Sequence, residues 1–243
     1  MKKLVWVFIV LAVGGCRTSE SPSNSKIKVS LSLLYEGQPL VLAEKRYRSA
    51  SGDIFTIERF QFYMSNVKFR NKETGEVFAV PNSYHLIERK PDSHLFELSF
   101  EVPAGRYNEM EFAVGVDPAR NLSTDQVGDL DPSNNMAWDW NTGYKFLLLE
   151  GKIFPPSGNP RGLVYHIGTD ENYRVIKLPL NTVIDTQSRL QHIIDIEAEV
   201  SGIFNTPNVI PISRHSTVMM GPVAALVADN YGQSVFRLRK VTY

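Results

Sequence analysis

Residues 136–151 read MAWDWNTGYKFLLLEG, an aromatic-rich segment followed directly by an apolar run. In an extended chain, the i,i+2 spacing of Trp138 and Trp140 puts both indoles on one face. A turn signal follows at 141–143, and the apolar run at 144–149 is long enough for a buried strand. Because so much aromatic surface is costly to expose, composition favours a core strand entered through an aromatic corner.

Alternation of apolar and polar residues, the pattern of a half-buried strand, dominates the rest of the chain. In residues 60–69 it predicts two opposite faces, the first with Phe60, Phe62, Met64 and Asn66 and the second with Tyr63, Ser65, Val67 and Phe69. The same pattern predicts further strands at 26–35, 76–80, 84–87, 94–101, 107–116, 145–152, 162–167, 175–180 and 192–200.

Many short strands separated by turns that contain Gly and Pro predict an all-β fold, an antiparallel β-sandwich with long loops. One stretch breaks the pattern: residues 217–230 have an Ala-rich centre and predict one short C-terminal helix. All-β folds commonly reach this length as one domain, so residues 27–243 are expected to form a single domain.

The N-terminus has the pattern of a secretion signal. A short basic region precedes an apolar run at 4–13, which is too short to span a bilayer as a helix but suits a signal peptide. Two glycines stand directly before Cys16, so residues 1–15 resemble a bacterial lipoprotein signal peptide that is removed while Cys16 receives the lipid. The alternative is an ordinary signal peptide with a chance cysteine.

Residues 16–26 are expected to form a lipidated cysteine and a flexible tether, because they are polar, rich in Ser and Pro and without periodicity. Arg17 stands where an aspartate would favour retention in the inner membrane of many Gram-negative bacteria. The pattern therefore predicts an outer-membrane lipoprotein of the cell envelope, on either face, whose membrane contact is the lipid anchor.

Charge and cysteine content exclude several classes of protein. Cys16 is the only cysteine, so lipidation leaves no disulfide, no thiolate metal ligand and no cysteine nucleophile. Without Lys2 and Lys3, 24 basic residues face 26 acidic ones, and this net charge of −2 supplies no basic footprint for nucleic acid. The common hydrolase, metalloprotease and P-loop motifs are missing from the sequence, so we do not expect an enzyme.

Two of the five histidines lie inside predicted apolar strands. Alternation puts His85 beside Ile87 and His166 beside Val164. A buried imidazole needs hydrogen bonds or a metal ion at its ring nitrogens, and a hydrogen-bonded structural histidine is the more common case. No two histidines are close in sequence, so a metal site would have to be assembled by the fold.

An oxygen-rich segment precedes the tryptophans and is a candidate binding site for a calcium ion. Its donors, within residues 125–135, are Asp125, Asp129, Asp131, Asn134 and Asn135. The segment does not match the EF-hand pattern, and Asp-Pro and Ser-Asn-Asn are also ordinary turn sequences.

The order of several motifs resembles the MbnP-like family, periplasmic copper-binding proteins first known from methanobactin operons. The central motif is M-x-W-x-W-x-x-G-Y-K-F, which begins at Met136. Other pieces agree in order: FYMSNV at 62–67, VPAGRY at 102–107, FAVGVD at 112–117 and YHIG at 165–168. The resemblance covers residues 54–168, with a weaker echo in ADNY at 228–231.

The resemblance implies a function in copper binding, for buffering, storage or uptake. In the family, copper is held by imidazoles and by kynurenine, which is made by oxidising a tryptophan. Carried over, this implies His166, with His85 and Met136 as further candidate ligands, and Trp138 or Trp140 as the modified residue, with Trp138 favoured because it lies nearer the loop. A haem peroxidase that oxidises the tryptophan and a copper import system are the implied partners.

The sequence departs from the family pattern at one position. Relatives often have a histidine in the loop before the tryptophans, where this chain has Leu122. If that histidine is a ligand in relatives, this protein lacks it, and His85 could replace it only if the fold brings it there. The alternative function is a non-metal interaction or scaffold module, with the tryptophans in the core and His166 hydrogen-bonded.

Overall fold

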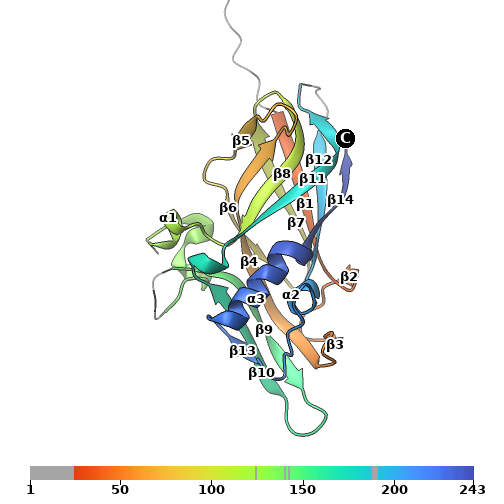
Figure 1. Ribbon diagram of the computed structural model, residues 1–243, viewed down its shortest axis with the longest axis vertical. Coiled ribbons are helices and arrows are strands. Elements are labelled where there is room, and N and C mark those ends of the chain that lie inside the picture. Colours follow the sequence, from red (N-terminus) through yellow and green to blue (C-terminus); the bar gives the residue numbers. More distant parts are fainter. Residues whose placement is uncertain (1–24, 124, 140, 142, 188–190) are drawn as a thin grey trace, which may run out of the picture.

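A computed structural model describes residues 25–123, 125–139, 141, 143–187 and 191–243. In these residues two β-sheets pack face to face, and the elongated molecule carries its helices at the middle of its length (Figure 1). The predicted all-β sandwich with long loops is confirmed. It is not wholly antiparallel, because two strand pairs, described below, are parallel.

The smaller sheet has five strands in the described part of the chain. Its central strand β1 (Ser25–Tyr35) pairs in parallel with β12 (His192–Glu199) and antiparallel with β7 (Leu95–Val102) and the short β2 (Gln38–Pro39). Strand β14 (Phe236–Thr242) forms the outer edge beside β12. The sequence pattern did not predict β14, because charged residues fill its outer positions.

The larger sheet has nine described strands arranged around the long strand β4 (Ile54–Arg70). One edge of β4 pairs first with β9 (Lys145–Phe154) and then with β8 (Arg106–Val114). Its other edge carries the remaining direct partners, β3 (Tyr47–Arg48), β6 (Tyr84–Glu88) and β5 (Val77–Ala79).

Three strands extend this larger sheet away from β4. Strand β11 (Arg174–Asp185) pairs with β8, and β10 (Arg161–Gly168) pairs with β9. The short strand β13 (Thr217–Val218) lies parallel to β10. The chain between β8 and β9 leaves the sheet where β4 changes partner, and it contains α1 (Pro118–Asn121) and the 3-10 turns η1 (Gly128–Leu130) and η2 (Pro132–Asn134).

A β-bulge in β4 corrects the predicted faces of that strand. Asn66 has a φ of +53°, and the register with β8 shifts between Ser65 and Lys68. A bulge inserts one residue without a partner, so every later side chain changes face. Val67 and Phe69 were predicted to share a face with Tyr63; they instead join the core that contains Phe60, Phe62 and Met64.

Apolar side chains form two separate clusters, one on each face of the larger sheet. The main core lies between the sheets. The second cluster lies on the outer face, beneath the chain that connects β8 and β9, and contains Tyr63, Val116, Leu130, Met136, Tyr144, Phe146 and Leu148. The long loop is therefore packed onto the sheet by its own apolar residues.

The C-terminal region forms the predicted helix. Helix α3 (Pro222–Asn230) continues into the π-helical turn η4 (Tyr231–Val235), and the short helix α2 (Gly202–Asn205) packs beside it. A further turn, η3 (Asp170–Asn172), links β10 to β11. Within the described residues, none of these helices is long and apolar enough to cross a membrane.

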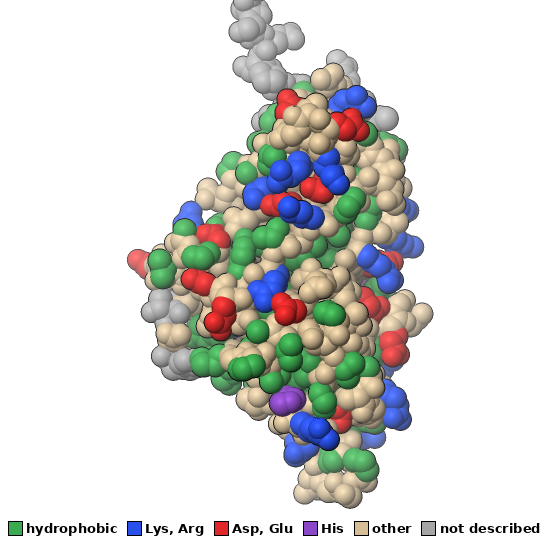
Figure 2. Space-filling view, in the orientation of Figure 1, with side chains coloured by type: hydrophobic (Ala, Val, Ile, Leu, Met, Phe, Trp, Pro, Cys, Tyr) green, Lys and Arg blue, Asp and Glu red, His purple; other side chains and the backbone are tan. Residues whose placement is uncertain are grey.

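Charged side chains mix on the upper half of the face drawn in Figure 2, where Lys and Arg gather with acidic residues. Two buried carboxylates of β8, Glu109 and Glu111, form ion pairs on the larger sheet. Glu111 lies 2.8 Å from Lys68 Nζ and 3.2 Å from Arg70 Nη2. Burial raises the pKa of Glu111, but these cations outweigh it and hold the pKa below its ordinary value.

Candidate functional site

His166 lies on the outer face of β10, opposite the side chains that point into the main core. Its neighbours Tyr165 and Ile167 are fully buried between the sheets, and the cross-strand partner of His166 is Leu148 of the outer cluster. The side chain of His166 is 15% exposed. Alternation in the sequence therefore predicted correctly that His166 and Tyr165 face opposite ways.

A carboxylate binds one nitrogen of His166. Glu150 of β9 places Oε1 2.7 Å from His166 Nε2 and accepts at Oε2 from Arg59 Nη1 at 3.0 Å. Burial raises the pKa of Glu150, but the hydrogen bond with His166 and the Arg59 guanidinium outweigh it, so the pKa lies below its ordinary value. Burial lowers the pKa of His166, although Glu150 opposes this shift. The lowered pKa favours the neutral imidazole.

The hydrogen bonds continue across the outer face toward β6. Arg59 Nη2 donates to Gln61 Oε1 at 3.4 Å, and Gln61 Nε2 donates to Glu88 Oε1 at 2.7 Å. Arg59 and Gln61 lie on β4 and Glu88 lies on the neighbouring β6, while Glu150 lies directly opposite Arg59 in the register of β9 and β4. A polar network therefore runs from His166 across four strands of the sheet.

Trp138 lies beside this histidine. Its ring centroid is 6.4 Å from that of His166, and the residue is only 7% exposed. A Cβ added at Gly168 would lie 2.8 Å from Trp138 Cζ2 and 2.5 Å from the Tyr144 carbonyl oxygen, so only glycine leaves room for this packing. The backbone around the tryptophan is held by an antiparallel β-bridge between Ala137 and Tyr144. The backbone N–H of Trp138 also donates to the Gly143 carbonyl at 3.0 Å.

A buried lysine completes the surroundings of Trp138. Lys145 is 9% exposed, donates from Nζ to the Asn135 carbonyl at 2.9 Å, and lies 5.8 Å from the Trp138 ring centroid. Burial lowers the pKa of Lys145, while the charges of Asp139 and Glu150 oppose that shift. The face of the indole therefore meets a cation as well as an imidazole.

The structure does not bring His85 to His166. Strand register pairs His85 with Met64, whose side chain faces the main core, whereas His166 lies on the outer face. The His85 ring is 5.4 Å from that of Phe100, and its buried Nε2 has no hydrogen-bond partner in the described structure. A two-histidine site is therefore not formed, because the backbone of the sheet separates the two rings.

Met136 is fully buried in the outer cluster with Tyr144 and Leu148. Trp140 and Cys16, together with the predicted signal peptide, lie outside the described residues. Among the residues that are described, no group of three or more His, Cys, Asp or Glu is placed to hold a metal ion.

The acidic segment before the tryptophans does not form the calcium site suggested by its composition. Asp129 Oδ2 accepts the Leu86 N–H at 2.8 Å, and Asp131 Oδ1 caps a turn by accepting the Ser133 N–H at 2.8 Å. Asn134 donates from Nδ2 to the carbonyl of Gly128 at 3.0 Å. These oxygens and amides shape turns, so calcium is not supported.

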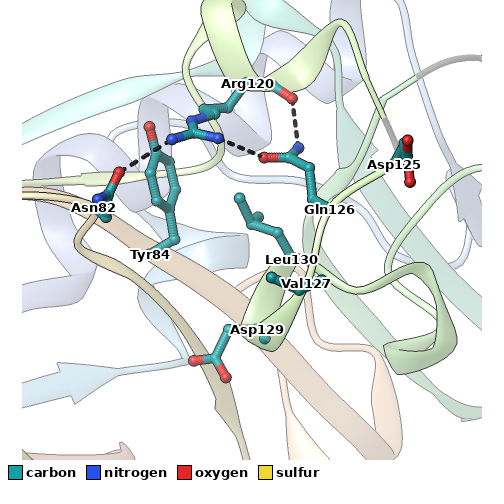
Figure 3. A pocket seen from close by; sticks show the side chains of 9 residues that line it. Asn82, Tyr84, Arg120, Asp125, Gln126, Val127, Asp129 and Leu130 are labelled. Atoms are coloured by element: carbon teal, nitrogen blue, oxygen red, sulfur yellow. Dashed lines mark hydrogen bonds between the residues drawn. The ribbon is translucent and has the colours of Figure 1, made fainter.

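This segment instead forms one wall of a cavity of about 600 Å³ (Figure 3). Arg120 crosses the opening, donating to Asn82 Oδ1 at 3.0 Å and to Gln126 Oε1 at 3.5 Å. Its guanidinium carbon lies 5.9 Å from the Tyr84 ring centroid. Sequence reasoning did not predict this cavity, because α1 and β6 meet only in the folded chain.

Leu122, which stands where the resemblance led us to expect a histidine, follows α1 and is 73% exposed. Leu122 lines a second cavity, of about 450 Å³, together with Asn141 and Thr169. Sequence reasoning also missed Glu150 and Arg59, because no sequence motif marks a residue whose role depends on its cross-strand neighbour. It assigned no role to Lys145, although Lys145 is part of the central motif.

Comparisons with known proteins agree with the motif order in the sequence. The solved structure of MbnP from Methylosinus trichosporium is similar, with a TM-score of 0.53 at 15% identity over 83% of this chain and 82% of that chain. At this identity the likeness concerns the fold alone. A comparison with curated proteins found no match. The model of the family described as MbnP matches residues 24–220, well over half of the chain, and the chain therefore belongs to the MbnP family.

Proposed function

We propose that this protein binds copper on the outer face of its larger sheet, beside His166 and Trp138. The observation that carries the proposal is the 6.4 Å between these two rings, which come from motifs 28 positions apart in the sequence. Imidazole is a good copper ligand, and copper has the highest affinity among divalent first-row metals for nitrogen and oxygen sites. Membership of the MbnP family supports the same function.

The intact side chains supply only part of such a site. His166 offers one ring nitrogen, because the other bonds to Glu150, and an indole nitrogen is a donor without a lone pair for a metal. Oxidation of Trp138 to kynurenine by two equivalents of hydrogen peroxide would break the indole C2–C3 bond, turn C3 into a ketone, release C2 as formate and leave the nitrogen as an aromatic amine. The ketone and the amine could then act as ligands. We therefore propose that a partner haem peroxidase supplies the oxidant and that copper binding depends on this modification.

Location and transport belong to the same proposal. The lipoprotein pattern at Cys16 supports a lipid anchor in the outer membrane, and a binding role, rather than catalysis, suits storage, buffering or delivery to a copper import system. Cys16→Ser should abolish incorporation of labelled fatty acid and release the protein from the membrane fraction. A variant that stays membrane-bound and lipid-labelled would contradict the anchor.

Copper analysis of protein purified from its native host, after copper supplementation, tests the central proposal. We expect copper near one equivalent in the wild type and its loss in His166→Ala and Trp138→Phe. His94→Ala is the matched control, because His94 lies in the loop before β7, outside this site, and should keep the copper. Wild-type copper far below one equivalent would contradict the proposal, and peptide mass spectrometry of the same sample reports whether Trp138 is modified.

One observation favours a different function, a non-metal interaction or scaffold module. The 2.7 Å contact between His166 and Glu150 already gives the imidazole a partner, as a structural histidine requires. On this alternative both tryptophans remain unmodified in cells that make the peroxidase, and His166→Ala lowers stability without changing metal content. The copper measurement and the mass spectrum therefore separate the two functions.

A further inference from the structure

The two ring nitrogens of His166 have different surroundings. Nε2 lies 2.7 Å from Glu150 Oε1, a distance typical of a hydrogen bond with a charged partner. Nδ1 has no hydrogen-bond partner among the residues that the structure describes. A neutral imidazole has one donor and one acceptor nitrogen, and the partner of either nitrogen decides which is which.

Glu150 can act only as an acceptor in this contact. Its second oxygen, Oε2, accepts from Arg59 Nη1 at 3.0 Å, and a guanidinium beside a carboxylate favours the ionised form. An ionised carboxylate has no proton to donate, so the proton in the contact must belong to His166 Nε2. Nδ1 is then the nitrogen that keeps its lone pair.

This arrangement is held by paired strands and not by a flexible loop. Val164, which precedes His166 by two residues on the same face of β10, lies opposite Glu150, and Arg59 lies opposite Glu150 on β4. Gln61 holds the guanidinium of Arg59 from the far side at 3.4 Å. Three neighbouring strands therefore keep the carboxylate in place against the imidazole.

We propose that Glu150, braced by Arg59, is a positioning residue that holds His166 as the Nε2–H tautomer and leaves Nδ1 as the atom that accepts a cation. The identity of the cation rests on the proposed function, so the copper measurements use protein from the native host in which Trp138 is modified, with Cu⁺ as the probe. A carboxylate bonded to the second nitrogen of a metal-binding histidine orients the ring and raises its basicity. His166 thus binds the cation through Nδ1, and its ring already has the required tautomer and orientation before the metal binds.

Nuclear magnetic resonance of metal-free, ¹⁵N-histidine-labelled protein tests the tautomer without copper. Long-range correlations between ring carbons' protons and ring nitrogens distinguish the Nε2–H and Nδ1–H forms, and His166→Asn assigns the signals. We expect the wild type to show the Nε2–H form alone. An Nδ1–H form, or an even mixture of the two, would overturn the inference from the wild-type spectrum alone.

Glu150→Gln tests the role of the carboxylate. A glutamine amide both donates and accepts, so both tautomers of His166 should become populated, and Cu⁺ affinity, measured by competition with a chelator, should fall about 10–100-fold. Glu58→Gln is the matched control, because Glu58 also forms an ion pair on this sheet, with Lys152 at 2.8 Å, but does not contact His166. The control should keep the tautomer and the affinity of the wild type.

The possible outcomes separate the inference from the proposed function. A single Nε2–H form in both the wild type and Glu150→Gln would overturn the positioning role of the carboxylate. A tautomer that changes in Glu150→Gln while Cu⁺ affinity does not would overturn Nδ1 as the cation-accepting atom. If the wild type has the expected tautomer but binds no Cu⁺ when it is purified from its native host with Trp138 modified, the proposed function fails and the positioning of His166 by Glu150 stands.

Discussion

At the scale of single residues, Gly168 and Trp138 define the position of the indole beside His166. Gly168→Ala should lower the free energy of unfolding by about 1–3 kcal/mol, because its Cβ would lie 2.8 Å from Trp138 Cζ2 and 2.5 Å from a backbone oxygen. Urea unfolding measures the change. The matched control is Gly162→Ala on the same strand, where nothing lies within 4 Å of the added atom.

The control variant should leave stability unchanged or raise it by up to about 1 kcal/mol, since it only reduces the freedom of the unfolded chain. Tryptophan fluorescence should change in Gly168→Ala and not in Gly162→Ala. Equal stability of the two variants would show that Trp138 can move away from Gly168 at little cost.

His85 makes stability depend on pH. Burial lowers the pKa of His85 below its ordinary value of 6.5, against a weaker opposing effect of Asp129. Below that value the unfolded chain binds a proton that the folded chain does not, so stability falls as pH drops from the unfolded pKa through the folded pKa. The shift at His166 has the same direction and adds to the effect.

The measurement is urea unfolding at about pH 7.5 and about pH 5, a range that covers the histidine window. The wild type should be less stable at the lower pH, and His85→Phe should lose less stability over the same interval because it removes one titrating group. His94→Phe serves as the control and should follow the wild type. A wild-type protein that gains stability on acidification would contradict the burial of a neutral His85.

At the scale of elements, Asn230 joins α2 to the end of α3. It is fully buried, donates from Nδ2 to the carbonyls of Ile203 at 2.8 Å and Asn208 at 2.7 Å, and accepts the Asn208 N–H at Oδ1. Asn230→Asp has the same shape but loses both donors and turns a charge toward two carbonyls. It should cost about 3 kcal/mol of stability in urea unfolding.

The control is Asn205→Asp, since among the described residues the side chain of Asn205, at the end of α2, bonds through its Oδ1 alone, which accepts the Ala50 N–H at 3.0 Å. Aspartate keeps that acceptor, so the change should stay within about 0.5 kcal/mol. If Asn230→Asp is equally mild, the buried amide is not what joins the two helices.

Strand β4 shows what local sequence can predict about an element. Alternation located its second half at 60–69, and the structure extends it to Ile54–Arg70. Alternation could not predict the change of partner from β9 to β8, nor the bulge, because both depend on strands that are far away in the sequence. Asn66 donates from Nδ2 to Asp117 Oδ2 at 2.9 Å and to the Tyr173 hydroxyl at 2.8 Å, contacts that explain asparagine at this left-handed position.

At the scale of the whole molecule, the C-terminal region contributes to the main core between the two sheets. Five fully or almost fully buried hydrophobic residues come from α3 and η4, namely Ala224, Val227, Ala228, Tyr231 and Val235, and β14 adds an edge strand to β12. These elements follow residue 220, where the match to the family model ends. The sandwich therefore depends on a segment beyond the matched span.

Deletion of residues 222–243 should abolish cooperative unfolding and expose the main core, because burial of large apolar side chains is the chief favourable term in folding. Circular dichroism during thermal unfolding and limited proteolysis measure this. Deletion of Tyr243 alone is the control, since it is 60% exposed and its hydroxyl bonds Thr182 at 2.9 Å. A truncated chain that still unfolds cooperatively would assign the stability to the matched region alone.

The sequence by itself determined the strands other than β2, β3, β13 and β14, the C-terminal helix and the family, because alternation and motif order are properties of the local sequence. It also determined that His166 faces away from Tyr165, since successive side chains of a strand point to opposite faces. Tertiary structure alone decided that Val67 joins the main core, that His85 and His166 lie on opposite faces, and that Glu150 meets both His166 and Arg59.

The physical reason is the range of the interactions. Glu150 is 16 positions from His166 and 91 from Arg59, and these contacts exist only once β10, β9 and β4 pair in a particular register. A single bulge shifts that register by one residue and reverses every face that follows it. Local pattern therefore places a residue on a strand, while the neighbours that give it chemistry are chosen by the pairing of the strands.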